Sequence, residues 1–378
     1  MSFGKPTTMG SAAPADTVLP ADAADTISSV SWSPAANHLA AASWDGKVRI
    51  YDVASGPSAH AAAMLSVDSP VLSCDWAKDG TMVLAGGADK KPHLLHLATG
   101  QQAAIGSHDA PIRSVRFLDT TTLGASPPAH LFATGSWDKT VNAPTASTPW
   151  IPIIATAERK IHLVDLRNPS VFLRTSDSPL KHQTRAVSVF PDGRGWATTS
   201  IEGRCGINAV DEPRDGKRYC RIIFSLSPNV RTQTTGTRLL STNFTFRCHR
   251  SAPDYNKTTK VYAVNDVQFH PVHTATFVTA GSDGSFHFWD RVTHTPAITT
   301  TAFNRDGSLF AYAVGYDWSK GDAANLPDYP NRLVLHSVTD EDVKPRGGNR
   351  LEIAWEEAYL GGRGRRLYGL RKAREVHT

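Results

Sequence analysis

Short apolar runs alternate with acidic turns along most of this chain, at a nearly constant distance. Runs of small apolar residues, such as Leu-Ala-Ala-Ala at 39–42, each lead into a turn that carries an acidic residue. The turns contain Asp45, Asp89, Asp138, Glu202, Asp283 and Asp317. In several copies a second alternating run follows, for example Lys-Val-Arg-Ile-Tyr-Asp at 47–52. We interpret each unit as strand, tight turn and strand, because alternation of apolar and polar residues is typical of half-buried strands.

A further strand is predicted upstream of each turn. These segments alternate apolar with polar residues, and most end in an aromatic residue: 27–32, 71–76, 112–117, 186–190, 264–269 and 298–303. Turn residues such as Lys-Asp-Gly at 78–80 come next. One copy alone would be an ordinary hairpin. A repeat of about 40–45 residues in register predicts the blades of an all-β, seven-bladed β-propeller.

The length and composition fit this prediction. The chain has 378 residues, of which 40% are hydrophobic and 20% charged, and a closed ring of blades can occupy such a length as one domain. No stretch approaches the length of apolar sequence that crosses a bilayer, so we expect no membrane insertion. The N-terminus lacks the pattern of a secretory signal.

The cysteines predict neither disulfides nor a metal site. They are scattered and form no Cys-x-x-Cys pair, as expected for reduced thiols in the cytosol or nucleus. Their positions are Cys74, Cys205, Cys220 and Cys248. We therefore expect no cofactor.

We divide the chain into three parts. Residues 1–15 are small and polar and are predicted to be disordered. Residues 16–346 form the propeller, in which 16–20 is a candidate strand to complete the last blade, because an open ring leaves unpaired edges. Residues 216–242 are an insertion without the repeat pattern. Residues 347–378 form a basic tail with helical spacing at 351–360.

The repeat is broken at three places. Glu158 follows Asp138 after only 20 residues, and the segment 142–149 contains prolines that prevent a central strand. Blades 3 and 4 together are therefore predicted to be incomplete, short by about half a blade. The other breaks lie at 216–242 and 291–296. An inexact exon model, alternative splicing and genuine loop divergence would each produce such breaks.

Positive charge is concentrated in two segments. The formal net charge is +5, and arginines gather in 204–250 and 346–374. This distribution indicates an anionic partner or improved solubility, and charge alone does not separate the two.

Several strings are more specific than the repeat. They are Ser-Ile-Glu-Gly-Arg at 200–204, Asn-Phe-Thr-Phe-Arg-Cys-His-Arg at 243–250, Phe-His-Pro-Val-His at 269–273, Gly-Ser-Asp-Gly-Ser-Phe-His-Phe-Trp-Asp at 281–290 and Tyr-Asp-Trp-Ser-Lys-Gly at 316–321. On these strings the chain resembles the RAE/GLE-type WD-repeat mRNA export factors of the nuclear pore, from about residue 16 to 346. The Bub-type spindle-checkpoint propellers share the Ile-Glu-Gly-Arg string.

The resemblance implies a function in nuclear transport. The family binds an acidic, partly helical segment, the GLEBS motif, of an FG-repeat nucleoporin, and the complex contacts RNA or messenger ribonucleoprotein. It also implies localisation to the nucleus and nuclear envelope at the pore, with shuttling to the cytoplasm. The implied partner-binding groove contains Arg204, Phe246, Arg247, Arg250, Trp289 and Arg291. Guanidinium groups suit carboxylates and phosphates, and aromatic rings supply apolar anchors.

Each of these residues also has a purely structural interpretation. Trp289 belongs to a Trp-Asp pair and would pack against its blade, and Arg204 follows a hairpin where solvated arginine is common. Phe246 alternates with Phe244 and would then be a core residue. The segment 291–296 is shorter than in the family, which would weaken an acidic-partner site.

No motif for catalysis is present, so we predict that the protein is not an enzyme. The sequence contains no nucleophile elbow, P-loop, zinc-protease motif or dinucleotide fingerprint. Two other binding functions stay open. One is a spindle-checkpoint scaffold for kinase-associated peptides of the mitotic checkpoint. The other is a substrate receptor of a cullin ubiquitin ligase, since Val-Asp-Leu-Arg at 164–167 resembles the Trp-Asp-x-Arg box of such ubiquitin-pathway adaptors.

Overall fold

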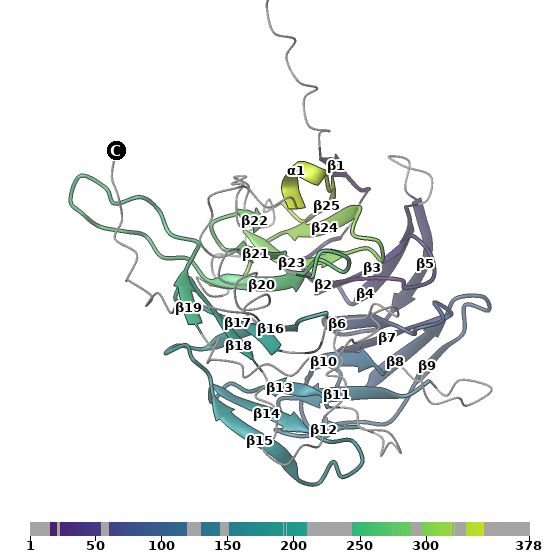
Figure 1. Cartoon of the computed structure of the whole chain (residues 1–378). Helices are drawn as coiled ribbons and strands as arrows, with labels where there is room; N and C mark the ends of the chain where they lie inside the picture. Colours follow the sequence, from purple (N-terminus) through teal and green to yellow (C-terminus); the bar gives the residue numbers. More distant parts are fainter. Residues whose placement is uncertain are drawn as a thin grey trace, which may run out of the picture.

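Seven antiparallel sheets follow one another along the chain and make the blades of a propeller (Figure 1). The computed structural model describes residues 16–20, 23–53, 60–118, 130–143, 151–191, 193, 195–209, 244–274, 276–288, 297–319, 321 and 330–343. The predicted disordered segment 1–15, the insertion at 216–242 and the tail at 347–378 lie outside these residues. The seven-bladed all-β fold predicted from the repeat is confirmed.

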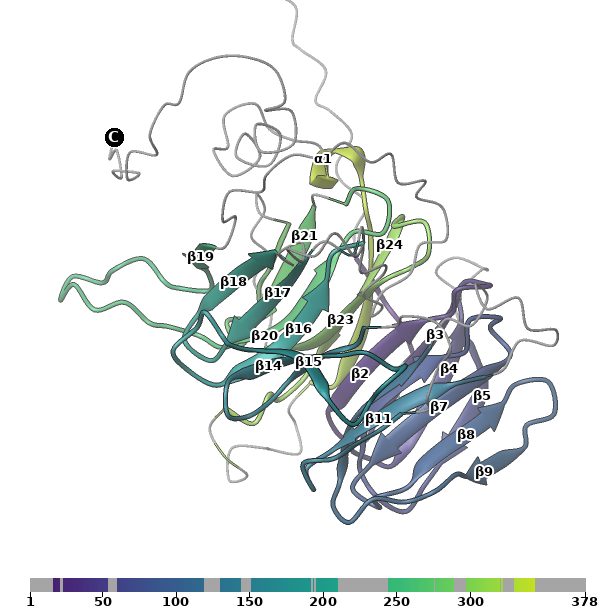
Figure 2. The same cartoon turned by 60° about the horizontal axis from the view of Figure 1, so that its bottom comes forward.

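Blades 1, 2 and 5 have four strands each. Blade 1 comprises β2 (Ile27–Trp32), β3 (His38–Ser43), β4 (Lys47–Asp52) and β5 (His60–Ser66). Blade 2 comprises β6 (Val71–Trp76), β7 (Met82–Gly87), β8 (Pro92–His96) and β9 (Gln102–Ala104). Blade 5 comprises β16 (Thr184–Val189), β17 (Gly195–Ser200), β18 (Arg204–Ala209) and β19 (Phe244–Arg247). The first strand of each blade lies innermost, as Figure 2 shows for β2 and β16.

Blades 3, 4 and 6 show three strands within the described residues. Blade 3 comprises β10 (Ile112–Phe117), β11 (Phe132–Ser136) and β12 (Val141–Asn142). Blade 4 comprises β13 (Ile153–Ala155), β14 (Lys160–Val164) and β15 (Phe172–Asp177). Blade 6 comprises β20 (Val264–Phe269), β21 (Phe277–Gly281) and β22 (Phe286–Phe288).

Blade 4 lacks its inner strand among the described residues. The turn at 156–159, which holds Glu158, joins β13 to β14, so these two strands match the pair that flanks the acidic turn in every other blade. Among the described residues, β12 of blade 3 is therefore followed by the second strand of blade 4. The outer strand of blade 3 is likewise not among the described residues. The predicted shortfall of half a blade agrees with this arrangement.

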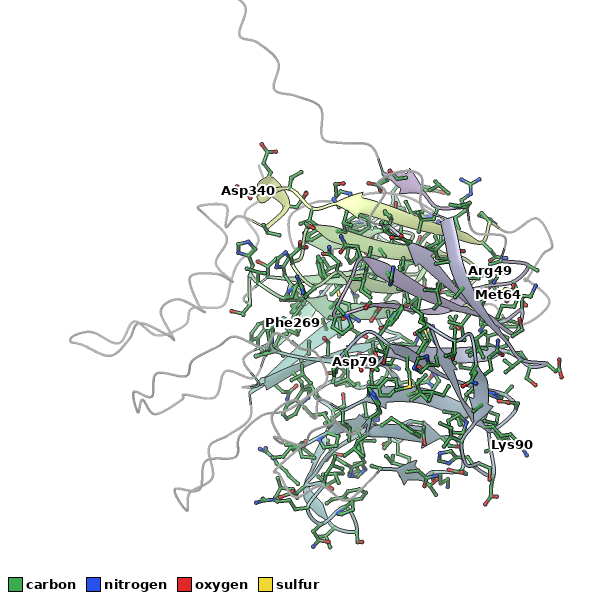
Figure 3. All side chains as sticks on the ribbon, turned by 90° about the vertical axis from the view of Figure 1, so that its right-hand side faces the viewer. Arg49, Met64, Asp79, Lys90, Phe269 and Asp340 are labelled. Carbon is green, nitrogen blue, oxygen red and sulfur yellow. The ribbon has the colours of Figure 1, made fainter. Side chains whose placement is uncertain are left out.

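The acidic turns are held by local hydrogen bonds and ion pairs. The Asp45 carboxylate accepts a hydrogen bond from the backbone N–H of Lys47 at 3.1 Å and an ion pair from Arg49 at 2.7 Å. Arg49 lies on β4 opposite Met64 of β5 (Figure 3). Gly46, which lies between Asp45 and Lys47, adopts φ +80°. A Cβ atom at this position would lie 2.3 Å from the Val67 carbonyl oxygen, so the turn requires glycine. The acidic residues of the repeat therefore serve turn geometry.

The N-terminal strand completes the last blade. Blade 7 comprises β1 (Thr17–Val18), β23 (Ile298–Phe303), β24 (Leu309–Val314) and β25 (Arg332–Ser337). In β1, Thr17 pairs with Leu335 and Val18 with Val334. The adjacent Leu19 is buried in a cluster with Trp32 and Leu333, which joins blade 1 to blade 7. The predicted closing role of residues 16–20 is confirmed.

A polar group fixes this closing strand. The Asp16 carboxylate lies 2.6 Å from His336 Nδ1 and accepts a hydrogen bond from the Tyr312 hydroxyl at 2.6 Å. His336 also lies 3.5 Å from Asp342 of the short helix α1 (Asp340–Val343).

No helix among the described residues is long and apolar enough to cross a bilayer.

Candidate functional site

Three of the predicted arginines lie together at the outer edge of blade 5. Arg204 begins β18 and lies directly opposite Arg247 of β19, and Arg250 follows shortly after that strand. We call Arg204, Arg247 and Arg250 the arginine cluster. β19 is the last strand of its sheet, so the cluster lies where blade 5 ends. Trp289 and Arg291 lie outside the described residues.

One carboxylate lies within the arginine cluster. Glu202 Oε2 is 3.4 Å from Arg204 Nε, and Arg250 donates to the backbone carbonyl of Glu202 at 2.8 Å. Glu202 also accepts a hydrogen bond from the backbone N–H of Lys181 at 3.1 Å. Arg247 is exposed. Among the described residues, only Arg204 of the cluster contacts the Glu202 carboxylate, so the cluster keeps a net positive charge.

The positive charges of the cluster act on one another. Burial lowers the pKa of Arg250, and the charges of Arg204 and Arg247 lower it further. An anion bound here would relieve that repulsion. Burial raises the pKa of the neighbouring Cys248 thiol to about 12, so this cysteine stays protonated and unreactive near neutral pH.

Phe246 packs inside the blade. Its ring centroid lies 6.1 Å from Phe244 and 6.2 Å from Phe277 of blade 6. All three rings belong to one apolar cluster between blades 5 and 6. These contacts match the core interpretation of Phe246.

Sequence reasoning did not select several other basic residues near the cluster. His182 Nε2 lies 3.8 Å from Glu202, and its side chain is 58% exposed. The hairpin between Arg250 and Val261, green in Figure 1, projects from the ring and carries exposed Lys257 and Lys260. These residues lie in loops outside the quoted strings, so only the concentration of positive charge could have indicated them.

One histidine cluster could hold a metal ion, but its geometry is explained by hydrogen bonds. His249 Nδ1 lies 2.8 Å from the Asp283 carboxylate, and Nε2 lies 3.0 Å from the Thr279 hydroxyl. His287 completes the group. Blade 3 repeats the arrangement, with His108 Nδ1 2.9 Å from Asp138 and Nε2 2.8 Å from a threonine hydroxyl. The recurrence in two blades indicates a structural network that ties a loop to the acidic turn.

The segment 164–167, which resembles a ubiquitin-ligase adaptor box, is internally paired. The Arg167 guanidinium donates to the Asp165 carboxylate at 2.9 Å, and Leu166 between them is buried.

The repeat and the architecture define the class of protein. The WD domain, G-beta repeat family matches residues 17–52, 62–94, 100–142 and 243–290. The solved WD40 β-propeller domain of Doa1 superposes with a TM-score of 0.57 at 14% identity, over 87% of this chain and 97% of that one. The chain is a WD-repeat β-propeller.

Relatives of known name narrow the class to a family. The chain is 42% identical to the WD40 repeat protein poxJ of Penicillium oxalicum, over 85% of this chain and 93% of that protein. It is 40% identical to the mRNA export factor GLE2 of Chaetomium thermophilum and 38% identical to the Poly(A)+ RNA export protein of Schizosaccharomyces pombe, in each case over 85% of this chain and 90% of the relative. The chain belongs to the GLE2/Rae1 family of WD-repeat mRNA export factors, and the resemblance found in its sequence is confirmed.

Proposed function

We propose that this protein is an adaptor in mRNA export, which binds an acidic GLEBS-type segment of an FG nucleoporin through its arginine cluster. The names of the relatives support the export role. The observation that supports the binding site is the convergence of Arg204, Arg247 and Arg250, whose positive charges act on one another and of which only Arg204 is paired with the Glu202 carboxylate. In this proposal the propeller joins messenger ribonucleoprotein to the pore and acts in the nucleus, at the nuclear envelope and while shuttling to the cytoplasm.

The chemistry of the site is equilibrium binding. Guanidinium groups form paired hydrogen bonds with carboxylates, and the exposed Arg247 is open to a partner. Lys257 and Lys260 on the projecting hairpin extend the positive surface beyond the blade. An acidic segment would lie along the edge of β19 and replace the repulsion among the arginines with attraction. No covalent step is involved, so the proposed function is non-enzymatic.

The domain division supports the same proposal. We propose that residues 16–346 form the binding unit and that 1–15 and 347–378 are appendages to it. The described residues 16–343 contain every blade and the whole arginine cluster.

The test is a double charge reversal, Arg204→Glu with Arg247→Glu. Binding of a GLEBS-type peptide, measured by calorimetry, should weaken at least about 100-fold, because charged pairs at an interface contribute about 2–5 kcal/mol when one partner is removed. The affinity of the unaltered protein should also fall as salt is added.

A matched control reverses two charges elsewhere. Lys91 of blade 2 and Arg332 of blade 7 are both exposed, and Lys91→Glu with Arg332→Glu should leave peptide binding unchanged. Equal affinity of the cluster variant and the control, with unchanged circular dichroism, would refute the proposed site.

A further inference from the structure

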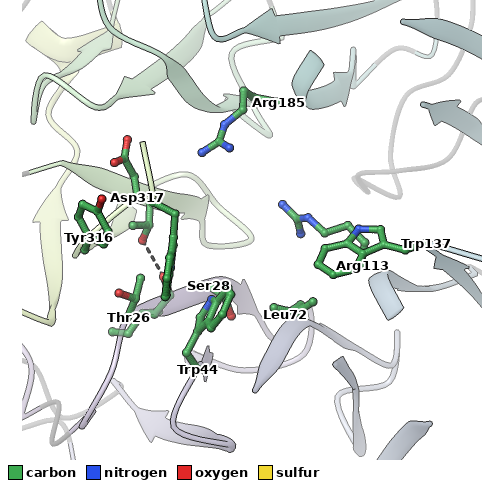
Figure 4. Close-up of a pocket in the computed structure, with 12 residues that line it drawn as sticks. Thr26, Ser28, Trp44, Leu72, Arg113, Trp137, Arg185, Tyr316 and Asp317 are labelled. Carbon is green, nitrogen blue, oxygen red and sulfur yellow. Dashed lines mark hydrogen bonds between the residues drawn. The ribbon is translucent and has the colours of Figure 1, made fainter. Parts of the chain in front are cut away.

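The mouth of the central channel contains a pocket of about 300 Å³ that is separate from the arginine cluster (Figure 4). Its walls come from the first residues of the inner strands and from the acidic-turn motifs. Blades 1, 2, 3, 5 and 7 all contribute to it. Blade 4 contributes no inner strand among the described residues, so the described inner strands on either side of it are β10 of blade 3 and β16 of blade 5.

A recurrent bulge turns one residue of five of the six described inner strands, all but that of blade 6, toward this space. In the six described inner strands the pairing skips the second residue, and in β16 it skips the third as well. A bulge of this kind directs a side chain away from the regular ladder. The skipped second residues are Ser28, Leu72, Arg113, Arg185, Asn265 and Thr299. Arg113 and Arg185 are the two charged members, and they are also the two exposed ones.

Neither arginine forms an ion pair with a carboxylate among the described residues, although the charge of Asp266 raises the pKa of Arg113 and the charge of Asp317 raises the pKa of Arg185. Arg185 donates to the neutral Asn265 side chain at 2.8 Å. Within the described part of the chain, Arg113 makes no hydrogen bond or ion pair. Asp317 also lines the pocket, but its carboxylate already accepts hydrogen bonds from Ser282, from Asn265 at 3.2 Å and from a backbone N–H at 3.2 Å.

The surroundings of the two arginines favour an anion. Water reaches both side chains within the channel, yet burial in the protein lowers the pKa of each guanidinium group. For Arg113 the positive charge of Arg185 lowers it further. In Figure 4 both groups extend from different blades toward the same space. A phosphate between them would remove the repulsion and accept hydrogen bonds from both.

Aromatic side chains form the other walls. Trp44 and Trp318 stack at 4.6 Å, and Tyr316 lies 5.7 Å from Trp318. Trp137 is 59% exposed, and its backbone N–H donates to the Pro111 carbonyl at 3.0 Å, close to the start of β10. An exposed indole face is suited to stacking on a nucleobase.

Two further observations indicate that the pocket accommodates a ligand. The indole nitrogen of Trp318 and the hydroxyl of Thr26 are buried, and neither has a hydrogen-bond partner within the described residues. Buried polar atoms are normally paired. The φ of +61° at Trp318 belongs to the turn of the repeat, because Lys90 and Lys139, which also follow the acidic residue of their turns, both adopt φ +69°.

We propose that the channel mouth binds one unpaired nucleotide of a single-stranded RNA, with its phosphate between Arg113 and Arg185 and its base against the tryptophans. A volume of about 300 Å³ suits a single nucleotide unit and excludes a duplex. An acidic peptide would use the arginines but would leave the aromatic walls without a flat partner. This inference rests on the proposed function, because mRNA export brings the protein to RNA.

The test measures binding of a short fluorescent oligoadenylate to the full chain by anisotropy. Arg113→Gln with Arg185→Gln should weaken binding at least about tenfold and reduce the slope of log affinity against log salt by about one. Trp137→Ala should weaken binding about tenfold, because it removes one stacking surface. Trp137 is largely exposed, so we expect Trp137→Ala to fold. This variant therefore still tests RNA binding by the pocket if the arginine variant fails to fold.

The controls separate this site from the arginine cluster. Lys91→Gln with Arg332→Gln removes the same charge elsewhere and should change affinity by less than about twofold. GLEBS-peptide binding should be unaffected by the pocket variants, whereas Arg204→Glu with Arg247→Glu should abolish it. Failure of peptide binding by the unaltered protein, with RNA binding retained, would count against the nucleoporin proposal alone.

Three results would overturn the inference. The first is unchanged RNA affinity in both folded pocket variants. The second is equal affinity for adenosine monophosphate and the oligonucleotide, which would assign the pocket to a free nucleotide. The third is loss of peptide binding without loss of RNA binding in the pocket variants, which would assign the pocket to an acidic peptide.

Discussion

Blade 7 and the boundary between blades 3 and 4 both depart from a blade made of four consecutive strands. In blade 7 the outer strand is β1, which comes from the opposite end of the described chain. At the boundary between blades 3 and 4, the described residues supply no replacement for the outer strand of blade 3 or the inner strand of blade 4. A distant segment completes blade 7, whereas no completing strand for blades 3 and 4 is found among the described residues.

The contacts at the two places differ accordingly. We call the boundary between blades 7 and 1 the closing seam. There, Trp32 of blade 1 donates to the Ala302 carbonyl of blade 7 at 3.2 Å, and Thr299 donates to the Ile27 carbonyl at 2.7 Å. Blades 3 and 4 meet through a small apolar cluster built on Leu118 and Leu166. Because the blades of a propeller are stabilised by their neighbours, an incomplete blade weakens its boundary while the rest of the ring keeps its contacts.

The largest expected effect comes from matched leucine truncations at the two boundaries. Leu333→Ala, in the closing seam, should destabilise the fold by about 4 kcal/mol, and Leu166→Ala by about 2 kcal/mol. Both side chains are buried, so the difference reports how tightly each boundary is packed. Urea unfolding measures both values. Equal losses would contradict the comparison.

The second largest effect is expected when the pH is raised, which should lower the stability of the closing seam. Burial alone would lower the pKa of His336, but its interactions with Asp16 and Asp342 outweigh this and raise the pKa to about 9 from an ordinary 6.5. A raised pKa stabilises the fold fully below pH 6.5, and the contribution, about 3 kcal/mol, is lost as the pH rises through 9. Unfolding midpoints between pH 6 and 10 should fall. A flat profile would refute the role of His336.

Neutralising the partner of His336 should have a smaller effect. Asp16→Asn removes the ion pair with His336 but keeps an oxygen that can accept from Tyr312, and we expect a loss of about 2 kcal/mol near neutral pH. The pH dependence should become shallower in this variant. Unchanged stability together with an unchanged profile would show that β1 is held by its backbone pairing alone.

The smallest effect is expected on the outer face of blade 4. The Lys160 and Asp177 side chains form an ion pair at 2.6 Å, but they are 43% and 79% exposed. Exposed pairs contribute little, so Lys160→Ala should leave the urea midpoint unchanged within error. A clear shift would mean that the incomplete blade depends on its surface charges.

The fold could be predicted from the sequence because each blade is encoded locally. Asp45 and Asp138 mark turns whose hydrogen bonds are formed within a few residues, so the acidic turn is readable from a single repeat. The shortfall between blades 3 and 4 was readable from the 20-residue interval before Glu158. The predicted start of the inner strand of blade 5, residue 186, was wrong by two residues. The strand begins at Thr184, and its irregular pairing between Thr184 and Val187 interrupts the alternation of apolar and polar residues.

The candidate sites were only partly predictable. Arg204, Arg247 and Arg250 were selected through the family resemblance, and the structure shows how they come together across β18 and β19. Arg185 lay just outside the predicted strand 186–190, and Arg113 inside 112–117 looked like an ordinary polar position. Their common direction follows from the bulges in β10 and β16, which the local sequence pattern does not reveal.

The closing strand also sets an order of events during synthesis. Asp16 is translated 320 residues before its partner His336. β1 therefore stays without its partner strand until β25 has been translated. A chain terminated before β25 could form individual blades but could not close the ring. Its unpaired β1 would stay exposed, and chaperones and proteases could recognise it as a sign of an incomplete chain.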